Sequence, residues 1–318
     1  MNTAPAPARP AQLLALDWGT SSLRGALLDA QGTVLDERAF ARGILTVPPG
    51  GFAEVFDASF GDWARTGVPL CLISGMAGSK QGWAEAPYCA CPAGFADLAG
   101  QLRWIEHSSL AIPVAIVPGL RCESELQADG LPPVPDVMRG EEVQIFGAIR
   151  HTGRTNGIFV LPGTHSKWAE VQDGRVRQFQ TFMTGEFFAL LSQHSLLARS
   201  ILADAPFDPA AFAQGVARAR SGAGLLHNAF GTRTFSLFER MAAPALASYL
   251  SGLVIGEELR ARHLQPGAEL VLVGSSTLVQ RYSHALSQHG ARIQALGAEA
   301  TWAGLHALAQ HIDHHDHT

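Results

Sequence analysis

Apolar residues at positions 13–16 form a short run that ends at Asp17. Such a run, bounded by a polar residue and a glycine, predicts a buried β-strand, and a second apolar stretch from Leu23 to a turn at residues 29–32 completes a predicted β-hairpin. Glycine lets a backbone approach an anion closely, and successive amides can point at it. The pattern therefore favours a phosphate-binding loop, with Asp17 able to hold Mg²⁺ through water. The loop residues are Gly19, Thr20, Ser21 and Ser22.

The same pattern returns about half a chain later. An apolar strand at residues 157–161 leads to a second loop, a second strand follows at residues 168–171, and a turn comes at residues 173–174. Two such hairpins predict duplicated halves that bind one nucleotide. When Gly19 is aligned with Gly163, Leu161 stands where Asp17 stands, so only the first hairpin carries a metal carboxylate. The second loop contains Gly163, Thr164, Ser166 and Lys167.

Between the hairpins, we expect a strand at residues 34–41, a helix at 52–63 and a strand at 68–73. Ligand groups in α/β folds gather beyond the carboxyl ends of strands, which here means Gly75, Met76 and Ser79. Residues 79–94 are rich in glycine, proline and aromatic residues and predict no regular element. This segment is either a connector or a substrate wall, and Trp83 and Tyr88 would suit the apolar face of a sugar-like ligand.

A helix is predicted from about residue 141, because apolar residues recur at helical spacing from residue 143 onward. A strand at residues 114–117 and an acidic, proline-rich loop at 122–136 precede it. Glu141 and Glu142 fall in the first turn of this helix. They could simply complement the helix dipole there, which contributes only about 0.3–1 kcal/mol each, or one of them could act in catalysis.

The later part of the chain is predicted to be largely helical, with a long helix from residue 184 through 201 and further helices to about 263. This insertion could form a lid, a dimer surface, or both. Strands at residues 269–273 and 292–296 follow, and then a helix at 300–311. Small residues after a strand let a flat adenine lie against the backbone, although a packing role for the glycine is the alternative. They are Gly274, Ser275 and Ser276.

Composition narrows the class of protein. With 318 residues, of which 47% are hydrophobic and 16% charged, the chain is longer than one typical core fills, so two lobes are expected. A net charge of −5 argues against a nucleic-acid surface. No apolar run approaches the ~20 residues that cross a bilayer, so we expect no membrane span and a cytoplasmic location. The four cysteines lack zinc-site spacing and are interpreted as reduced, structural thiols.

Six sequence blocks, taken in their order along the chain, resemble one family. The N-terminal Asp-x-Gly-Thr hairpin, the second Gly-Thr hairpin and the late Gly-Ser-Ser block are similar to the sugar kinase/heat-shock-70/actin ATPase superfamily. The blocks together look more closely like the 2-dehydro-3-deoxygalactonokinase family. They lie at residues 17–24, 75–79, 82–88, 137–142, 162–168 and 183–186.

The resemblance implies an α/β, two-lobed ribonuclease H-like (actin-like ATPase) fold, with duplicated βββαβαβα halves and a helical insertion in the second lobe. We expect a disordered segment at 1–10, a first lobe at 11–151, a second lobe at 152–299, a second connecting helix at 300–311 and a flexible, histidine-rich tail at 312–318. ATP and Mg²⁺ would lie between the lobes. The implied reaction phosphorylates the 6-hydroxyl of 2-dehydro-3-deoxy-D-galactonate.

In such kinases a carboxylate at the start of an interdomain helix accepts the proton of the attacking hydroxyl. Glu141 is preferred here because it follows Gly140, with Asp136 a close second and Glu142 third. The acceptor's carboxylate would need an arginine. The candidates are Arg24, Arg121 and Arg139, each of which could instead form a salt bridge. Substrate contacts are also expected from Gly75, Met76, Ser79, Trp83 and Tyr88.

Two alternatives remain. A kinase of another small sugar or sugar acid would share the nucleotide loops. A non-catalytic nucleotide-binding sensor or chaperone on the same fold would be expected to carry an added module, for which the sequence offers only short terminal segments. The sugar-acid kinase is preferred, with no nucleic-acid or membrane partner and with a homodimer as one option.

Overall fold

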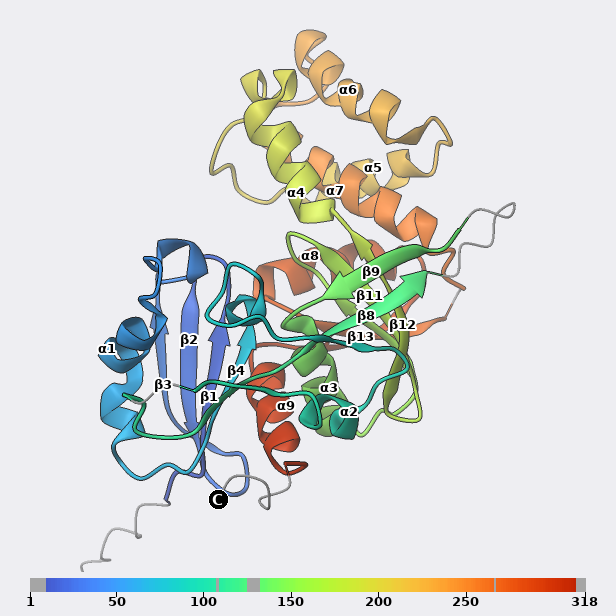
Figure 1. The fold of residues 1–318 in the computed structure, drawn as a ribbon. Coiled ribbons are helices and arrows are strands. Elements are labelled where there is room, and N and C mark those ends of the chain that lie inside the picture. Colours follow the sequence, from blue (N-terminus) through green and yellow to red (C-terminus); the bar gives the residue numbers. More distant parts are fainter. Residues whose placement is uncertain (1–9, 107–108, 125–131, 266, 313–318) are drawn as a thin grey trace, which may run out of the picture. The chain divides into compact units, whose positions relative to one another are not determined.

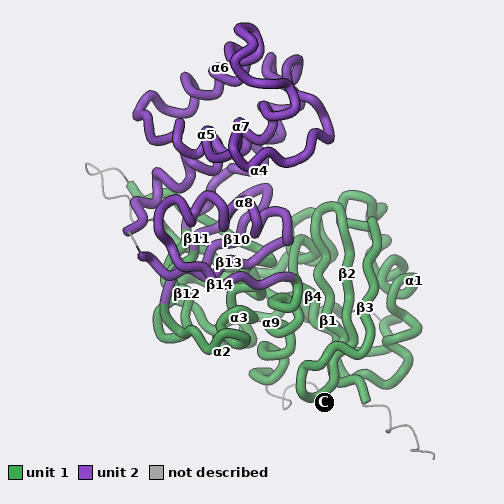
Figure 2. The backbone as a smooth tube through the Cα atoms, turned by 180° about the vertical axis from the view of Figure 1, so that it is seen from behind, with its two compact units in different colours: residues 1–156, 169–179, 298–318 green, residues 157–168, 180–297 purple. Residues whose placement is uncertain are grey.

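A computed structural model describes residues 10–106, 109–124, 132–265 and 267–312. The chain divides into two compact units, drawn in green and purple in Figure 2. Unit 1 contains residues 1–156, 169–179 and 298–318, and unit 2 contains residues 157–168 and 180–297. Residues 169–179, expected in the second lobe, thus belong to unit 1. The predicted disordered segment and histidine-rich tail fall almost wholly outside the described residues.

Unit 1 is built on a six-stranded sheet of order β3-β2-β1-β4-β7-β6 (Figure 1). Strand β1 pairs antiparallel with β2 and parallel with β4, and β4 pairs parallel with β7. The carboxyl ends of β1 and β4 therefore meet at one edge, where Asp17 pairs with Ser74. The strands are β1 (Leu13–Trp18), β2 (Leu23–Leu28), β3 (Val34–Phe40), β4 (Cys71–Gly75), β6 (Arg103–Trp104) and β7 (Val114–Ile116).

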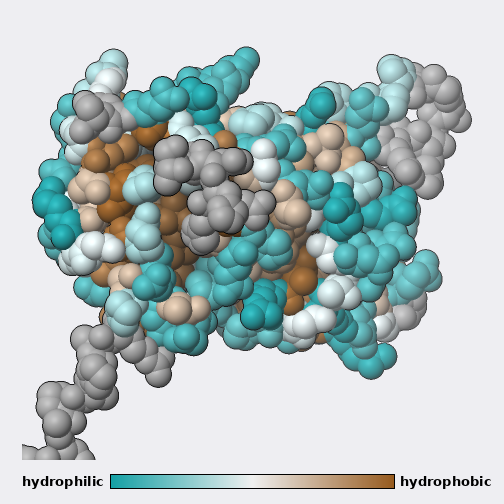
Figure 3. All heavy atoms as spheres, turned by 60° about the horizontal axis from the view of Figure 1, so that its bottom comes forward, coloured by the Kyte–Doolittle hydropathy of each residue, from teal (hydrophilic) through white to brown (hydrophobic). Residues whose placement is uncertain are grey.

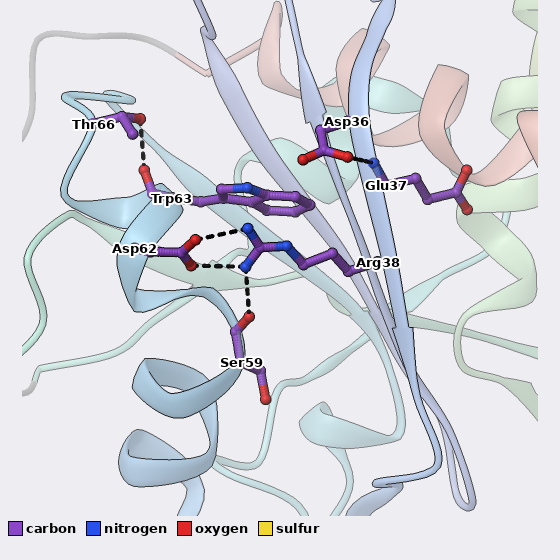
Figure 4. Close-up of polar contacts among 7 residues, drawn as sticks. All are labelled: Asp36, Glu37, Arg38, Ser59, Asp62, Trp63 and Thr66. Atoms are coloured by element: carbon purple, nitrogen blue, oxygen red, sulfur yellow. Dashed lines mark hydrogen bonds and ion pairs between the residues drawn. The ribbon is translucent and has the colours of Figure 1, made fainter.

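Helix α1 (Phe52–Ala64) covers this sheet because its buried side chains, including Phe56 and Phe60, join the core of unit 1. Its outer side is fixed to β3 by Arg38, shown in Figure 4. The guanidinium donates two 2.7 Å hydrogen bonds to the carboxylate of Asp62 and lies 4.0 Å from the ring centre of Trp63. These bonds lower the pKa of Asp62 to about 2.

A second, three-stranded sheet in unit 1 corrects two predicted loops. Its order is β5-β8-β9, with β5 and β8 parallel and β8 and β9 antiparallel. Tyr88 therefore lies in a strand rather than in a segment without regular structure. Both ends of the predicted loop at 122–136 are also strands, which contain Arg121 and Asp136. The strands are β5 (Tyr88–Ala90), β8 (Gly119–Ser124) and β9 (Val134–Met138).

Two helices of unit 1 cross at very short range. They are α3 (Glu141–Thr152) and α9 (Glu299–Ala309). A Cβ atom on Gly147 would lie 1.7 Å from the carbonyl oxygen of Ala300, and one on Gly304 would lie 2.0 Å from that of Val143. Only glycine allows this approach. The short helix α2 (Phe95–Ala99) also belongs to this unit, where Phe95 stacks on His311.

The five-stranded sheet has the order β12-β11-β10-β13-β14, which repeats the order β3-β2-β1-β4-β7 of the six-stranded sheet. As expected for the second half of a duplicated ribonuclease H-like fold, β10 and β13, and β13 and β14, pair in parallel. Helix α8 (Ser276–Ser287) packs against this sheet through Tyr282 and Leu286. The strands are β10 (Gly157–Leu161), β11 (Ser166–Gln172), β12 (Arg175–Phe182), β13 (Glu269–Val273) and β14 (Arg292–Leu296).

The insertion in unit 2 is helical, but the single helix expected at residues 184–201 is wrong. The segment forms α4 (Thr184–Ala189), a π-helical turn (Leu190–His194) and a 3₁₀ helix (Leu196–Arg199). The break falls at Ser195, which is extended and whose hydroxyl accepts a hydrogen bond from the amide of Leu197. The other helices are α5 (Pro209–Ala219), α6 (Gly224–Leu237) and α7 (Ala243–Ala261).

A cavity of about 330 Å³ lies in unit 1 at the amino-terminal ends of the strands. Leu13, Leu70, Pro113 and His306 are among its lining residues, and none of the predicted site residues lines it. Figure 3 shows the lower face of the molecule in Figure 1, where hydrophobic residues in brown are exposed between hydrophilic ones in teal. No helix in the described part of the chain is long and apolar enough to cross a membrane.

Candidate functional site

The first predicted phosphate loop is a tight turn with exposed hydroxyl groups. It joins β1 to β2, and the amide of Gly19 donates a 2.9 Å hydrogen bond to the carbonyl of Ser22. Thr20, Ser21 and Ser22 are all exposed. The amide of Ile44 bonds to the carbonyl of Gly19, so a neighbouring segment supports the loop. The turn is thus held in place while its hydroxyls and amides stay open to a ligand.

Asp17 lies beside this loop and is half-buried. Its Oδ2 accepts a 2.5 Å ion-pair hydrogen bond from Nη2 of Arg24, the residue opposite it on β2. The guanidinium of Arg24 also lies 5.7 Å from the ring centre of Trp302. Arg24 is therefore engaged by the predicted metal carboxylate, which makes it a weaker candidate for the acceptor's carboxylate.

A single carboxylate is compatible with Mg²⁺, which keeps several waters and commonly takes one or two protein carboxylates together with substrate phosphate oxygens. Within the described residues, no group of three or more histidine, cysteine, aspartate or glutamate side chains forms a metal site. Asp17, partly exposed beside the loop hydroxyls, has the chemistry to hold the ion through water.

Two glycines bring the ends of β4 and α3 close to Asp17. Gly75 has φ +93° and Gly140 has φ +105°, conformations that other residues rarely adopt. A Cβ on Gly75 would lie 3.2 Å from Oδ1 of Asp17, and one on Gly140 would lie 3.3 Å from Cα of Gly75. Unit 1 thus gathers Asp17, the Gly75 block and the start of α3 in one place.

Helix α3 begins at Glu141, as predicted, and its first turn carries two different carboxylates. Glu141 is half-buried, and its Oε2 accepts a 3.0 Å hydrogen bond from the amide of Arg139. Glu142 is fully buried, and its Oε2 accepts a 2.7 Å bond from the amide of Gly140. Its Oε1 has no hydrogen-bond partner among the described residues. Burial, reinforced by the charge of Glu141, raises the pKa of Glu142 to about 8.

The third carboxylate candidate stands apart from these two. Asp136 is in β9, two residues before the end of the strand, and its Oδ1 accepts a hydrogen bond from the amide of its neighbour Val137. Glu141 and Glu142, by contrast, directly follow Gly140, the glycine that lies against Gly75.

Arg139 is a buried arginine with unused donors. Its side chain is 9% exposed, and its Nη2 donates a 2.8 Å hydrogen bond to the carbonyl of Ala86. Its guanidinium lies 4.3 Å from the ring centre of Tyr88. Nε and Nη1 have no partner in the part of the chain that the structure describes, and neither do the nearby buried hydroxyls of Ser74 and Ser79. Unpaired buried donors at a predicted substrate site indicate a polar ligand or water there.

Other predicted substrate residues are placed differently. Trp83 packs into an aromatic cluster, with ring centres 6.0 Å from Trp18 and 5.8 Å from Phe56. Met76 also packs against the core of unit 1. Arg121 is exposed on β8. These contacts give Trp83 and Met76 a packing role at least as strong as a ligand role.

The second predicted phosphate loop lies in unit 2 and is supported by the start of α4. Thr164 is exposed, and its carbonyl accepts a 3.0 Å hydrogen bond from the amide of Glu186. A Cβ on Gly185 would lie 2.4 Å from the carbonyl oxygen of Gly163, so only glycine fits there. Lys167 is 5% exposed, and its Nζ donates to the hydroxyl of Thr181 at 2.9 Å.

The predicted adenosine block also lies beside this loop. Gly274 directly follows β13, and a Cβ there would lie 3.6 Å from the carbonyl oxygen of Pro162. Ser275 and Ser276 are exposed at the start of α8. A small cavity of about 40 Å³ lies between the loop and α8. Its lining residues include Gly163, Gly185, Leu278 and Arg281. Unit 2 thus brings the second loop and the Gly-Ser-Ser block together.

Comparison with known proteins decides the family. The family model 2-keto-3-deoxy-galactonokinase matches residues 17–308. The chain is 38% identical to a Rhizobium meliloti (strain 1021) protein, DgoK1, described as a probable 2-dehydro-3-deoxygalactonokinase, over 94% of this chain and 96% of that one. It is 30% identical to the Escherichia coli (strain K12) 2-dehydro-3-deoxygalactonokinase, over 95% of this chain and 99% of that one. The chain belongs to the 2-keto-3-deoxy-galactonokinase family.

Solved structures agree with this assignment and with the predicted fold. A crystal structure of a Sinorhizobium meliloti protein assigned to 2-dehydro-3-deoxygalactonokinase matches with a TM-score of 0.84 at 38% identity, over 94% of this chain and 99% of that one. The Acidaminococcus fermentans (R)-2-hydroxyglutaryl-CoA dehydratase component A, at 11% identity and a TM-score of 0.50, shares only the fold. The resemblance inferred from the sequence blocks is confirmed, and the chain is a kinase of this family.

One residue of this family member was not singled out from the sequence. Glu258 is buried in α7 and accepts hydrogen bonds from Ser166 and Trp168 of the second hairpin. A carboxylate one residue before Leu259 and three after Ile255, both buried, lies on the apolar face of the helix. That position was the available indication, since buried carboxylates are rare unless they are paired.

Proposed function

We propose that this protein transfers the γ-phosphoryl group of ATP to the 6-hydroxyl of 2-dehydro-3-deoxy-D-galactonate. The products are 2-dehydro-3-deoxy-6-phospho-D-galactonate and ADP. The observation that carries the proposal is the family match over residues 17–308, which includes both hairpin loops and the start of α3. A kinase of another small sugar acid is the alternative.

The two hairpin loops are proposed to bind the phosphates of ATP. Gly19 and the exposed hydroxyls of residues 20–22 would do so from unit 1, and Gly163 and Thr164 from unit 2. Gly274, Ser275 and Ser276 would contact the adenosine. Lys167 would bind the phosphates from the base of its loop, where its Nζ donates a hydrogen bond to Thr181. Mg²⁺, held by Asp17, would supply positive charge that offsets the charge of the phosphates.

For the acceptor, Arg139 is the preferred partner of the substrate carboxylate. Its buried Nε and Nη1 are free of protein partners within the described residues, and an arginine fork fits a carboxylate well. Arg24 is bonded to Asp17, and Arg121 is exposed. The hydroxyls of Ser74 and Ser79 could bind substrate hydroxyls nearby.

Glu141 remains the preferred general base. It is half-buried at the start of α3, so a substrate hydroxyl can reach it, whereas Glu142 is fully buried. Glu141→Gln keeps the hydrogen bond to the amide of Arg139 but cannot accept a proton, so kcat should fall by roughly 10²–10⁴ with little change in substrate binding. Asp136→Asn is the matched variant: if it abolishes turnover and Glu141→Gln does not, the base is Asp136.

The function is tested by an ATP-coupled screen of purified protein. Aldonate-derived 2-keto-3-deoxy acids are compared with glucose and galactose at equal concentrations. We expect turnover only with acids, and the highest kcat/KM with the galactonate derivative. Equal turnover of a neutral hexose would refute the substrate assignment, although the kinase fold would stand.

We also propose that the enzyme forms a homodimer and works in the cytoplasm. All four cysteines are free, which fits a reducing compartment. Helix α6 exposes Leu226 (91%), Phe230 (54%) and Leu237 (56%), positions that share one face of a helix. Light scattering should give twice the mass of one chain for the wild type and one chain for Leu226→Glu/Phe230→Glu. Leu45→Glu, at another exposed leucine, is the control, and a monomeric wild type would refute the dimer.

A further inference from the structure

The buried carboxylate of Glu258 connects four separate segments of unit 2. Its Oε1 accepts hydrogen bonds from Oγ of Ser166 at 2.8 Å and from Nε1 of Trp168 at 2.5 Å. Its Oε2 accepts bonds from Oη of Tyr282 at 2.7 Å and from the hydroxyl of Thr184. These five residues, from β11, α4, α7 and α8, are called the Glu258 cluster.

The cluster is buried, and within the described residues it contains no cationic partner. Glu258 is 3% exposed, and Ser166 and Trp168 are fully buried. All four donors are neutral groups, and the described residues include no ion pair to this carboxylate. Burial raises the pKa of Glu258, while the four donors oppose that shift. Burying a carboxylate costs free energy unless its oxygens are hydrogen-bonded. Removing the carboxylate would in turn leave several buried donors without an acceptor.

Three of the four donors, Ser166, Thr184 and Tyr282, lie beside the predicted nucleotide site. Ser166 lies in the second phosphate loop, at the first position of β11. Thr184 is the first residue of α4, whose next residue, Gly185, touches the carbonyl of Gly163. Tyr282 lines the small cavity together with Gly163 and Gly185. The carboxylate itself lies behind these groups rather than among the exposed loop residues.

We propose that Glu258 is a positioning residue that fixes the second phosphate loop and the start of α4 in the geometry that binds the nucleotide. This inference rests on the proposed function, because it assigns the loop at residues 163–167 to the phosphates of ATP. Glu258 would act through Ser166 and Thr184, without touching ATP.

The test uses Glu258→Ala, Glu258→Gln and Tyr282→Phe, with Glu257→Gln as control. Glu257 is the adjacent carboxylate on α7, and its partner is the surface residue Arg260. The readouts are KM for ATP, KM for the sugar acid, kcat, and ADP affinity by calorimetry, measured at least 15 °C below each variant's Tm.

Glu258→Ala should weaken ADP binding and raise KM for ATP by about tenfold or more, with less than a twofold change in KM for the sugar acid. Glu258→Gln, whose amide oxygen can still accept two of the donors, and Tyr282→Phe, which removes one donor, should show smaller changes in the same direction. Glu257→Gln should behave as wild type. If Glu258→Ala does not fold, the two milder variants decide the matter.

Variants with a lowered Tm but wild-type ADP affinity and KM for ATP would overturn the inference, because they would show a purely structural role. An equal rise in both KM values would do the same. Failure of the proposed function is distinguished in the wild type. Wild-type protein that binds ADP but ignores the galactonate derivative refutes the substrate alone, whereas wild-type protein that binds no nucleotide refutes both.

Discussion

Replacement of Glu142 by glutamine should remove part of the pH dependence of the free energy of unfolding. The side chain of Glu142 is fully buried, one of its oxygens has no partner among the described residues, and burial raises its pKa from 4.5 to about 8. Between these pH values the folded protein holds a proton that the unfolded chain releases. The stability contributed by protonated Glu142 is therefore present below the unfolded value and is lost as the pH rises through the folded value.

The magnitude follows from the width of this interval. Each pH unit is worth about 1.4 kcal/mol for one proton, and the interval covers more than three units, so Glu142→Gln should gain roughly 4 kcal/mol on the wild type between pH 5 and pH 9. The glutamine oxygen can still accept the hydrogen bond from the amide of Gly140, so the two proteins should have similar stability near pH 5.

Denaturant unfolding at pH 5, 6, 7, 8 and 9 measures this difference directly. The subtraction removes every titrating group that the two proteins share. Glu54→Gln, at an exposed glutamate in the first turn of α1, is the control and should follow the wild type at each pH. A difference between Glu142→Gln and wild type that stays constant across the range would refute the argument.

Three further outcomes are expected. Asp17→Asn should lower kcat by about 10²-fold or more and raise the Mg²⁺ concentration needed for activity, with a near-normal melting temperature; normal turnover would remove Asp17 from the metal site. Gly147→Ala should destabilise unit 1 by at least about 2 kcal/mol, measured by denaturant unfolding, because its Cβ would overlap the carbonyl of Ala300. Asp62→Asn should cost less than about 1 kcal/mol in the same assay, since its ion pair with Arg38 is exposed.

Several strands of the two large sheets could be predicted because they are short apolar runs with a clear end, whereas the two-residue strand β6 was not predicted. The second strand, residues 23–28, and the two late strands at 269–273 and 292–296 have the predicted bounds. The start of α3 at Glu141 was predicted because a glycine precedes it and apolar spacing follows. Buried parallel strands and capped amphipathic helices are specified largely by local sequence.

The three-stranded sheet could not be predicted in this way. Its strands β5 and β9 expose many of their residues, including Tyr88 and Val137, so they lack the continuous apolar run of a buried strand. They are strands because they pair with β8, which is a tertiary interaction. The long helix predicted at residues 184–201 is likewise interrupted, because Ser195 is extended and ends the π-helical turn.

The site shows a similar division between local and tertiary information. Asp17 and the loop hydroxyls follow from sequence because they are adjacent in the chain. The bond between Arg24 and Asp17 depends on strand register, and the packing of Trp83 against Trp18 joins residues 65 positions apart. From the sequence, Arg24 and Arg139 were equal candidates for binding the substrate carboxylate. In the structure Arg24 is bonded to Asp17, whereas two donors of Arg139 have no partner among the described residues.

The duplicated hairpins place a carboxylate in two different relations to the loop. In unit 1 the half-buried carboxylate of Asp17 comes from the strand itself. One of its oxygens is bonded to the guanidinium of Arg24, and the other faces Gly75 at the end of β4. In unit 2 the equivalent position is Leu161, and the buried carboxylate of Glu258 comes from α7, with all its contacts made to neutral donors. The first arrangement leaves charge available to a ligand, and the second uses it internally. Under the proposed function, Asp17 holds the metal ion in the first half, and the carboxylate of Glu258 in the second half holds the loop.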